Sequence, residues 1–116
     1  MLVRIDPASA TPLAEQITAQ VRGAIAEGRL RPGERLPSAR DLAEALDVNM
    51  HTVLRAYGQL REEGLLELRP GRGATVRGTA AAGHARLVQA VLALLAESRR
   101  LGLSVEEVIS EVRRLA

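Results

Sequence analysis

The apolar positions in the first third of the chain follow two different periods. Alternation over residues 2–5 predicts a short strand at the N-terminus. Over residues 13–25 the apolar side chains recur every three or four positions, which predicts a helix that ends near Gly28. Thr11 is the expected N-cap of this helix. Pro12 suits its first turn, because a proline lacks the N–H that the first turn leaves unpaired.

Two shorter amphipathic segments follow, after a loop that contains two prolines. The first begins at Ser38, a suitable N-cap with Asp41 three residues later, and ends near Leu46. After a short connection, Asn49 caps a third helix that Gly64 ends. The expected buried face of this third helix consists of Val53, Ala56, Tyr57 and Leu60. Two short helices joined this tightly are typical of a helix-turn-helix.

A basic, glycine-rich hairpin is predicted directly after the third helix. Residues 65–69 and 74–77 favour strands, and Pro70-Gly71-Arg72-Gly73 lies between them as a turn. A hairpin in this place is a wing. The expected fold class is therefore mainly α with a small β wing, in which a winged helix-turn-helix precedes a two-helix C-terminal tail.

The composition shifts to alanine-rich helix formers at Thr79, so we expect a DNA-binding domain of residues 1–78 and a dimerisation region of residues 79–116. The first tail helix is apolar on more than one face, and a capping box at residues 104–107 opens the second. A surface of this kind needs a partner, which predicts a homodimer. The residues expected in the dimer interface are Leu87, Val91, Leu95, Val105, Val108, Ile109 and Val112.

Several classes of function find no support in the composition. The chain has no Cys, and His51 and His84 lie far apart without ligand spacing, so neither a metal nor a cofactor is expected. The sequence contains no Ser/His/Asp grouping and no P-loop, which argues against an enzyme. Because it also shows no signal peptide and no apolar run of membrane length, we expect a cytoplasmic protein without a membrane partner.

The basic residues alone do not identify a partner. All sixteen are Arg, yet the formal net charge is only +2. Arg binds phosphates and guanine edges well, but a GC-rich genome explains the same composition at least equally well.

The face of the third helix that points away from the predicted core carries the main candidates for DNA contact. His51 and Arg55 can hydrogen-bond to bases or phosphates, whereas Met50 and Leu54 can make only apolar contacts, for instance to a thymine methyl. Arg40 can hold a phosphate beside the second helix, or it can pair with a neighbouring acid. The full candidate set is Ser38, Arg40, Asn49, Met50, His51, Thr52, Arg55, Arg69, Gly71, Arg72 and Gly73. Solvated side chains on an ordinary surface are the competing interpretation.

Several motifs in fixed order carry a family resemblance. They are Pro12-Leu13, Gln16-Ile17, Pro32-Gly33, Leu36-Pro37-Ser38-Ala39-Arg40, Arg55-Ala56-Tyr57, Glu63-Gly64-Leu65 and Gly71-Arg72-Gly73. The resemblance that they carry covers about two thirds of the chain. This order resembles the DNA-binding domain of the GntR family of bacterial regulators. By its length and position, the tail is similar to that of the YtrA-like subfamily, in which two C-terminal helices mediate dimerisation.

The resemblance implies a sequence-specific transcription regulator, with DNA contacts at Arg40, residues 49–52, Arg55 and the wing glycines. We expect a repressor that binds a palindromic operator in double-stranded DNA as a homodimer. A small-molecule effector is a further candidate partner. Met50 and Leu54 depart from the residues usual in the family, so no operator sequence can be carried over. The alternative is a winged helix used for protein contact and assembly, without specific DNA binding.

Overall fold

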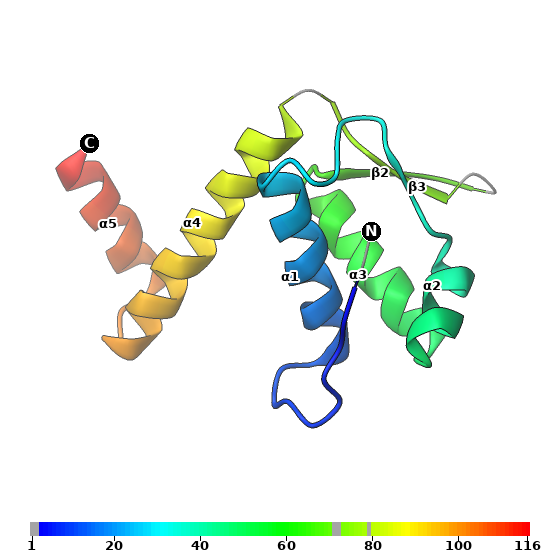
Figure 1. The fold of residues 1–116 in the computed structure, drawn as a ribbon. Coiled ribbons are helices and arrows are strands. Elements are labelled where there is room, and N and C mark those ends of the chain that lie inside the picture. Colours follow the sequence, from blue (N-terminus) through cyan, green and yellow to red (C-terminus); the bar gives the residue numbers. More distant parts are fainter. Residues whose placement is uncertain (1–2, 71–72, 79) are drawn as a thin grey trace. The chain divides into compact units, whose positions relative to one another are not determined.

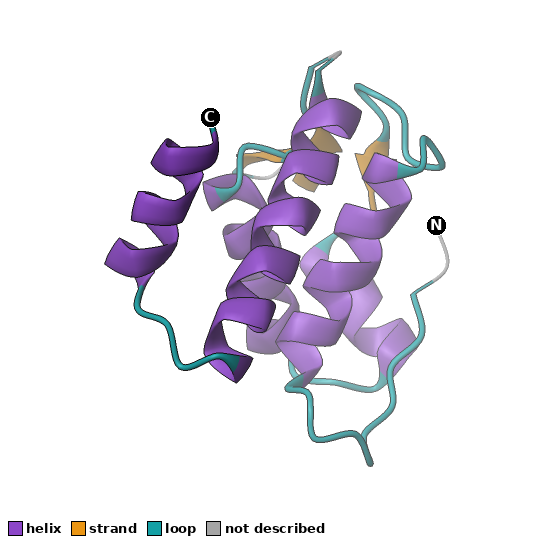
Figure 2. Cartoon of the chain, turned by 90° about the vertical axis from the view of Figure 1, so that its left-hand side faces the viewer, coloured by secondary structure: helices purple, strands orange, loops and turns teal. Residues whose placement is uncertain are grey.

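The computed structural model describes residues 3–70, 73–78 and 80–116, and the chain divides into two compact units, Met1–Arg86 and Leu87–Ala116. The elements of the first unit are α1 (Leu13–Ala26), β1 (Arg35–Leu36), α2 (Ala39–Leu46), α3 (Met50–Glu62), β2 (Leu66–Arg69) and β3 (Gly73–Val76) (Figure 1). Helix α4 (Ala81–Arg100) begins in the first unit and continues into the second, which ends with α5 (Val105–Leu115). The predicted fold class is confirmed: helices dominate, and the strands form one small sheet (Figure 2).

The sheet has one strand more than the predicted hairpin. Its order is β1-β3-β2, and both pairings are antiparallel. In β1, Arg35 pairs with Thr75 and Leu36 with Ala74, so the proline-containing loop before α2 is fastened to the wing. The sheet and the helices bury an aliphatic core, in which the largest fully buried side chains are Ile17, Ile25, Leu60, Leu65, Leu66, Val21 and Val53. Ala81 and Ala85, at the start of α4, are buried against the same core.

The N-terminal segment is not the predicted strand: residues 3–5, the described part of that prediction, have no strand partner. Side-chain amides of α1 take the place of a neighbouring strand. The Arg4 N–H donates to Gln20 Oε1 at 2.8 Å, and Gln20 Nε2 donates to the Arg4 carbonyl. The Asp6 N–H donates to Gln16 Oε1 at 2.8 Å. Because these amides satisfy the extended backbone, the segment needs no place in a sheet.

Two of the three N-caps predicted in this unit are present. Ser38 Oγ accepts from the Asp41 N–H at 3.1 Å, and Asn49 Oδ1 accepts from the His51 N–H at 2.8 Å. The predicted cap at Thr11 is wrong: α1 starts one residue later, and its N-cap position is Pro12, which has no capping side chain.

The second unit contains α4 from Leu87 onward and all of α5, which confirms the two-helix tail. The turn between them has Gly102 at φ +71° and a hydrogen bond of 2.9 Å from the Leu103 N–H to the Ser98 carbonyl. The predicted capping box is formed: Ser104 Oγ accepts from the Glu107 N–H at 3.1 Å, and Glu107 Oε1 accepts from the Ser104 N–H at 3.2 Å. None of the helices over the described residues has the length and apolar character that a membrane crossing requires.

Candidate nucleic-acid interface

The two helices of the helix-turn-helix are joined by the only aromatic side chain of the protein. Tyr57, in the middle of α3, donates from its hydroxyl to the Pro37 carbonyl at 2.7 Å. Pro37 directly precedes Ser38, the N-cap of α2. Burial raises the pKa of Tyr57, so the phenol remains a donor at any physiological pH. The hydrogen bond therefore fixes the start of α2 relative to the middle of α3.

A buried ion pair fastens the C-terminal end of α3 to α1. Arg22 Nε and Nη2 donate to the two carboxylate oxygens of Glu63 at 2.8 and 2.7 Å, and both side chains are only 9% exposed. Gln59 Nε2 adds a third hydrogen bond to Glu63 at 3.0 Å. Burial by itself raises the pKa of Glu63, but the hydrogen bonds from Arg22 and Gln59 and the charge of Arg22 outweigh it and hold the pKa below its ordinary value.

The outward face of α3 is the predicted one. Val53, Ala56, Tyr57 and Leu60 are buried, whereas His51 and Arg55 are exposed and Thr52 is half-buried. Met50 and Leu54 lie on the exposed side as well, although both are large and apolar. Whether these side chains contact DNA stays a prediction.

Arg40 is exposed in the first turn of α2, and no carboxylate of the described residues lies within ion-pair distance of it. The pairing with a neighbouring acid that the sequence left open, with Asp41 or Glu44 as the candidates, is therefore not formed. Arg40 borders a shallow hollow of about 490 Å³ between α2 and α3, lined by Arg40, Ala43, Glu44, Asp47, Val48 and Met50. Its guanidinium is available for a phosphate or a base edge.

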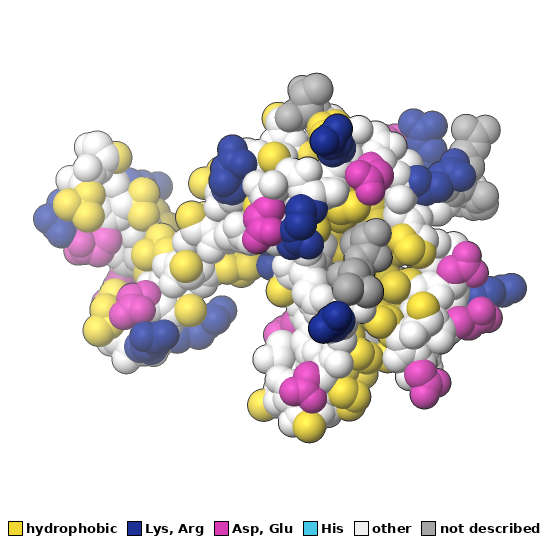
Figure 3. All heavy atoms as spheres, in the orientation of Figure 1, with side chains coloured by type: hydrophobic (Ala, Val, Ile, Leu, Met, Phe, Trp, Pro, Cys, Tyr) yellow, Lys and Arg dark blue, Asp and Glu magenta, His cyan; other side chains and the backbone are white. Residues whose placement is uncertain are grey.

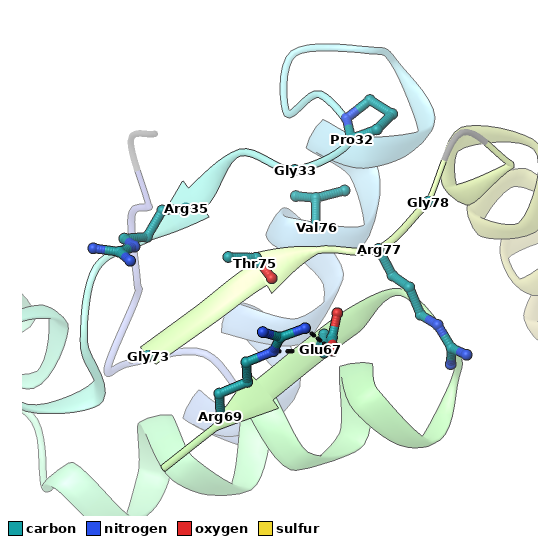
Figure 4. A pocket seen from close by; sticks show the side chains of 10 residues that line it. All are labelled: Pro32, Gly33, Arg35, Glu67, Arg69, Gly73, Thr75, Val76, Arg77 and Gly78. Carbon is teal, nitrogen blue, oxygen red and sulfur yellow. Dashed lines mark hydrogen bonds and ion pairs between the residues drawn. The ribbon is translucent and has the colours of Figure 1, made fainter. Parts of the chain in front are cut away.

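On the wing, Arg69 is already paired. Its Nε and Nη2 donate to Glu67 Oε1 at 3.1 and 2.8 Å across the outer face of the sheet (Figure 4). Gly73 has φ +78°, which favours glycine at the start of β3. The predicted contacts Gly71 and Arg72 lie outside the described residues.

The outer face of the sheet carries two arginines that were not among the predicted contacts. Arg35 and Arg77 border a hollow of about 430 Å³ over β1, β2 and β3, but their guanidinium groups extend away from its centre (Figure 4). Arg35 was missed because a two-residue strand leaves no periodic signal. Over the first unit, basic and acidic side chains alternate on the face shown in Figure 3 and form no uniform basic surface.

No group of three potential metal ligands occurs among the described residues. Of the predicted dimer residues, Leu87, Val91, Val105, Ile109 and Val112 are exposed, and Leu95 is half-buried. Val108 differs, because it is only 7% exposed in a single copy of the chain. Its side chain is therefore already covered within one copy of the chain.

Residues 13–76 match the family described as bacterial regulatory proteins, gntR family. The chain is 43% identical over 72 residues to the HTH-type transcriptional repressor YtrA of Bacillus subtilis (strain 168), a match that covers 62% of this chain and 55% of that protein. The chain thus spans about half the length of that relative. It is also 36% identical over 102 residues to the HTH-type transcriptional regulator Rv1152 of Mycobacterium tuberculosis (strain ATCC 25618 / H37Rv), covering 88% of this chain and 84% of that protein.

Solved structures agree with these matches. YtrA from Sulfolobus acidocaldarius, a GntR-family transcription factor, superposes with a TM-score of 0.64 at 34% identity, covering 97% of this chain and 95% of that one. The DNA-binding domain of AraR in complex with operator ORX1 gives a TM-score of 0.56 at 28% identity, covering 62% of this chain and 89% of that one. The predicted resemblance to YtrA-like regulators is confirmed.

Proposed function

Because this chain belongs to the gntR family of bacterial regulatory proteins, we propose that it is a transcriptional repressor that binds a palindromic operator as a homodimer in the cytoplasm. The observation that carries the proposal is the joined pair α2 and α3. Their N-termini are capped by Ser38 and Asn49 and flanked by the exposed Arg40, which has no carboxylate partner among the described residues. Helix N-termini and a guanidinium fork together suit phosphates and base edges.

The proposed division of roles follows from the placement of the side chains. The first turn of α3 enters the major groove, where His51 and Arg55 reach base edges or phosphates. Arg40 and the amides at the start of α2 hold the backbone, while Arg69 and Gly73 bring the wing to a neighbouring phosphate or minor groove. The AraR domain, whose fold is similar, is in complex with an operator in its own structure.

Homodimerisation would use the exposed apolar side chains of the second unit, among them Val105, Ile109 and Val112. Two copies double the contacts and require two half-sites about one helical turn apart, roughly 34 Å, or a multiple of it.

Fluorescence anisotropy of labelled duplexes at several salt concentrations tests the proposal, using the DNA upstream of the gene itself and a pool selected from random sequence. Each phosphate contact should add about 0.9 to the slope of log affinity against log salt. Arg55→Ala should lose affinity, whereas Arg29→Ala, a control arginine paired with Glu27 on the surface, should not. If no duplex binds, DNA binding is refuted and a protein-contact module is the better explanation.

A further inference from the structure

We propose that Met50 and Leu54 make α3 a reader of C5-methyl groups, so that the operator carries thymine, or 5-methylcytosine, opposite these two side chains. The proposal rests on the DNA-binding function proposed above and specifies what the exposed face of α3 recognises. Two large apolar side chains of α3 are unusually exposed. Met50 is 38% and Leu54 44% exposed, on a helix whose other apolar face is closed into the core.

The two side chains form one patch. They are four residues apart on a regular helix, so they occupy the same stripe, one turn apart. Polar neighbours border the patch, with His51 and Arg55 each one position further along the helix. Neither apolar side chain is one of the buried members of the core, nor one of the half-buried side chains packed against it. A large part of each apolar side chain therefore remains open to a partner.

The surroundings of Met50 favour a base edge over a phosphate. The hollow beside it contains one cation, Arg40, and two exposed carboxylates, Glu44 and Asp47. A phosphate would meet an excess of negative charge there, which opposes its binding. Arg40 is exposed and can hold the DNA backbone, while the apolar side chain faces the floor of the groove.

The major groove offers one kind of apolar group. Among the four bases, only thymine presents a methyl there, at C5, and the C5 of cytosine carries the same group when methylated. An apolar side chain against any other edge would desolvate donors and acceptors without pairing them, which is unfavourable. Two exposed apolar side chains on a groove-reading helix therefore gain affinity where C5-methyl groups meet them.

The test removes the methyl and changes nothing else. A duplex selected from a random pool by the wild-type protein is resynthesised with each thymine replaced in turn by deoxyuridine, and its affinity is measured by anisotropy. One or two positions per half-site should lose about fourfold in affinity, the equivalent of one buried methyl group. Replacing such a thymine–adenine pair by 5-methylcytosine–guanine should retain more affinity than replacing it by cytosine–guanine.

Protein variants, combined with these DNA changes, complete a double-mutant cycle. Each of Met50→Ala and Leu54→Ala should lose the preference for thymine over uracil at the position that the replaced side chain contacts. Alanine is chosen because it maintains the helix. Leu115→Ala, a control at an exposed apolar residue of α5, should keep the wild-type ratio between the two duplexes. Specific binding in which no replacement of thymine by uracil lowers the affinity would overturn methyl recognition. So would a preference for thymine over uracil that both alanine variants retain. Either result would leave the proposed DNA-binding function intact. The absence of any specific duplex overturns the proposed function with it.

Discussion

The buried pair between Arg22 and Glu63 provides the sharpest test of how the DNA-binding unit is held together. Replacing Glu63 by Gln keeps the shape of the side chain but removes its charge. The wild-type carboxylate accepts two charge-assisted hydrogen bonds from Arg22, at 2.8 and 2.7 Å. The amide that takes its place in the Glu63→Gln variant has one oxygen to accept and leaves the guanidinium partly unpaired at a site that is only 9% exposed.

Breaking a buried pair by removing one partner costs about 3 to 5 kcal/mol, and the retained acceptor should recover part of this. We therefore expect Glu63→Gln to lower the free energy of unfolding at neutral pH by about 2 to 3 kcal/mol. The matched control is Glu67→Gln, which breaks a pair that is 57% and 47% exposed and should cost at most about 0.5 kcal/mol. Urea denaturation followed by far-UV circular dichroism measures the free energy of unfolding of both variants and of the wild type.

The pH dependence gives an independent check. Because the pKa of Glu63 is lower in the folded chain than its ordinary value of about 4.5, ionised Glu63 stabilises the fold above that value. This stabilisation is lost as the pH falls through the folded pKa. The difference in unfolding free energy between wild type and Glu63→Gln should be constant near neutral pH and shrink below about pH 4.

Two results would refute this account. One is a loss in Glu63→Gln no larger than that of the surface control. The other is a difference from wild type that does not change in acid. The double variant Arg22→Leu with Glu63→Leu should regain most of the stability, because a buried pair and well-packed apolar side chains are often equivalent.

Three further predictions concern binding and assembly. Arg40→Ala should weaken operator binding by about 1 to 3 kcal/mol in anisotropy titrations without changing the circular dichroism spectrum. Glu67→Gln should strengthen operator binding, because it frees Arg69 and removes a negative charge that faces phosphate; unchanged or weaker binding would contradict this role of the wing. Ile109→Glu should shift the mass in light scattering to that of a 12.4 kDa monomer, whereas Val108→Glu should also destabilise the second unit because Val108 is already buried.

The sequence predicted what depends on near neighbours. The caps at Ser38, Asn49 and Ser104 are each completed by a backbone N–H two or three residues away, and the buried face of α3 follows from its period alone. These features need no knowledge of the rest of the fold, so they were predictable from short windows of sequence. The outward face of α3 follows from the same period.

Features that join distant parts of the chain were missed for the complementary reason. Strand β1 has two residues and exists only because β3 lies beside it, 40 positions later in the case of Arg35 and Thr75. Arg22 and Glu63 are 41 positions apart, and neither residue type indicates its partner. The prediction of an N-terminal strand was wrong because the side-chain amide of Gln20 hydrogen-bonds to the backbone of Arg4. The alternation of apolar residues cannot reveal such a contact.

Tyr57, whose hydroxyl joins α2 to α3, also gives the protein an intrinsic optical signal. No other aromatic residue occurs in the chain, since it has neither Trp nor Phe and only one Tyr. Near-ultraviolet absorbance and fluorescence therefore observe the first unit alone, whereas far-ultraviolet dichroism observes the helices of both units. Comparing the two signals during unfolding would reveal, without any label, whether the second unit melts separately from the first. A titration with alkali would show the phenol ionising only when its surroundings open.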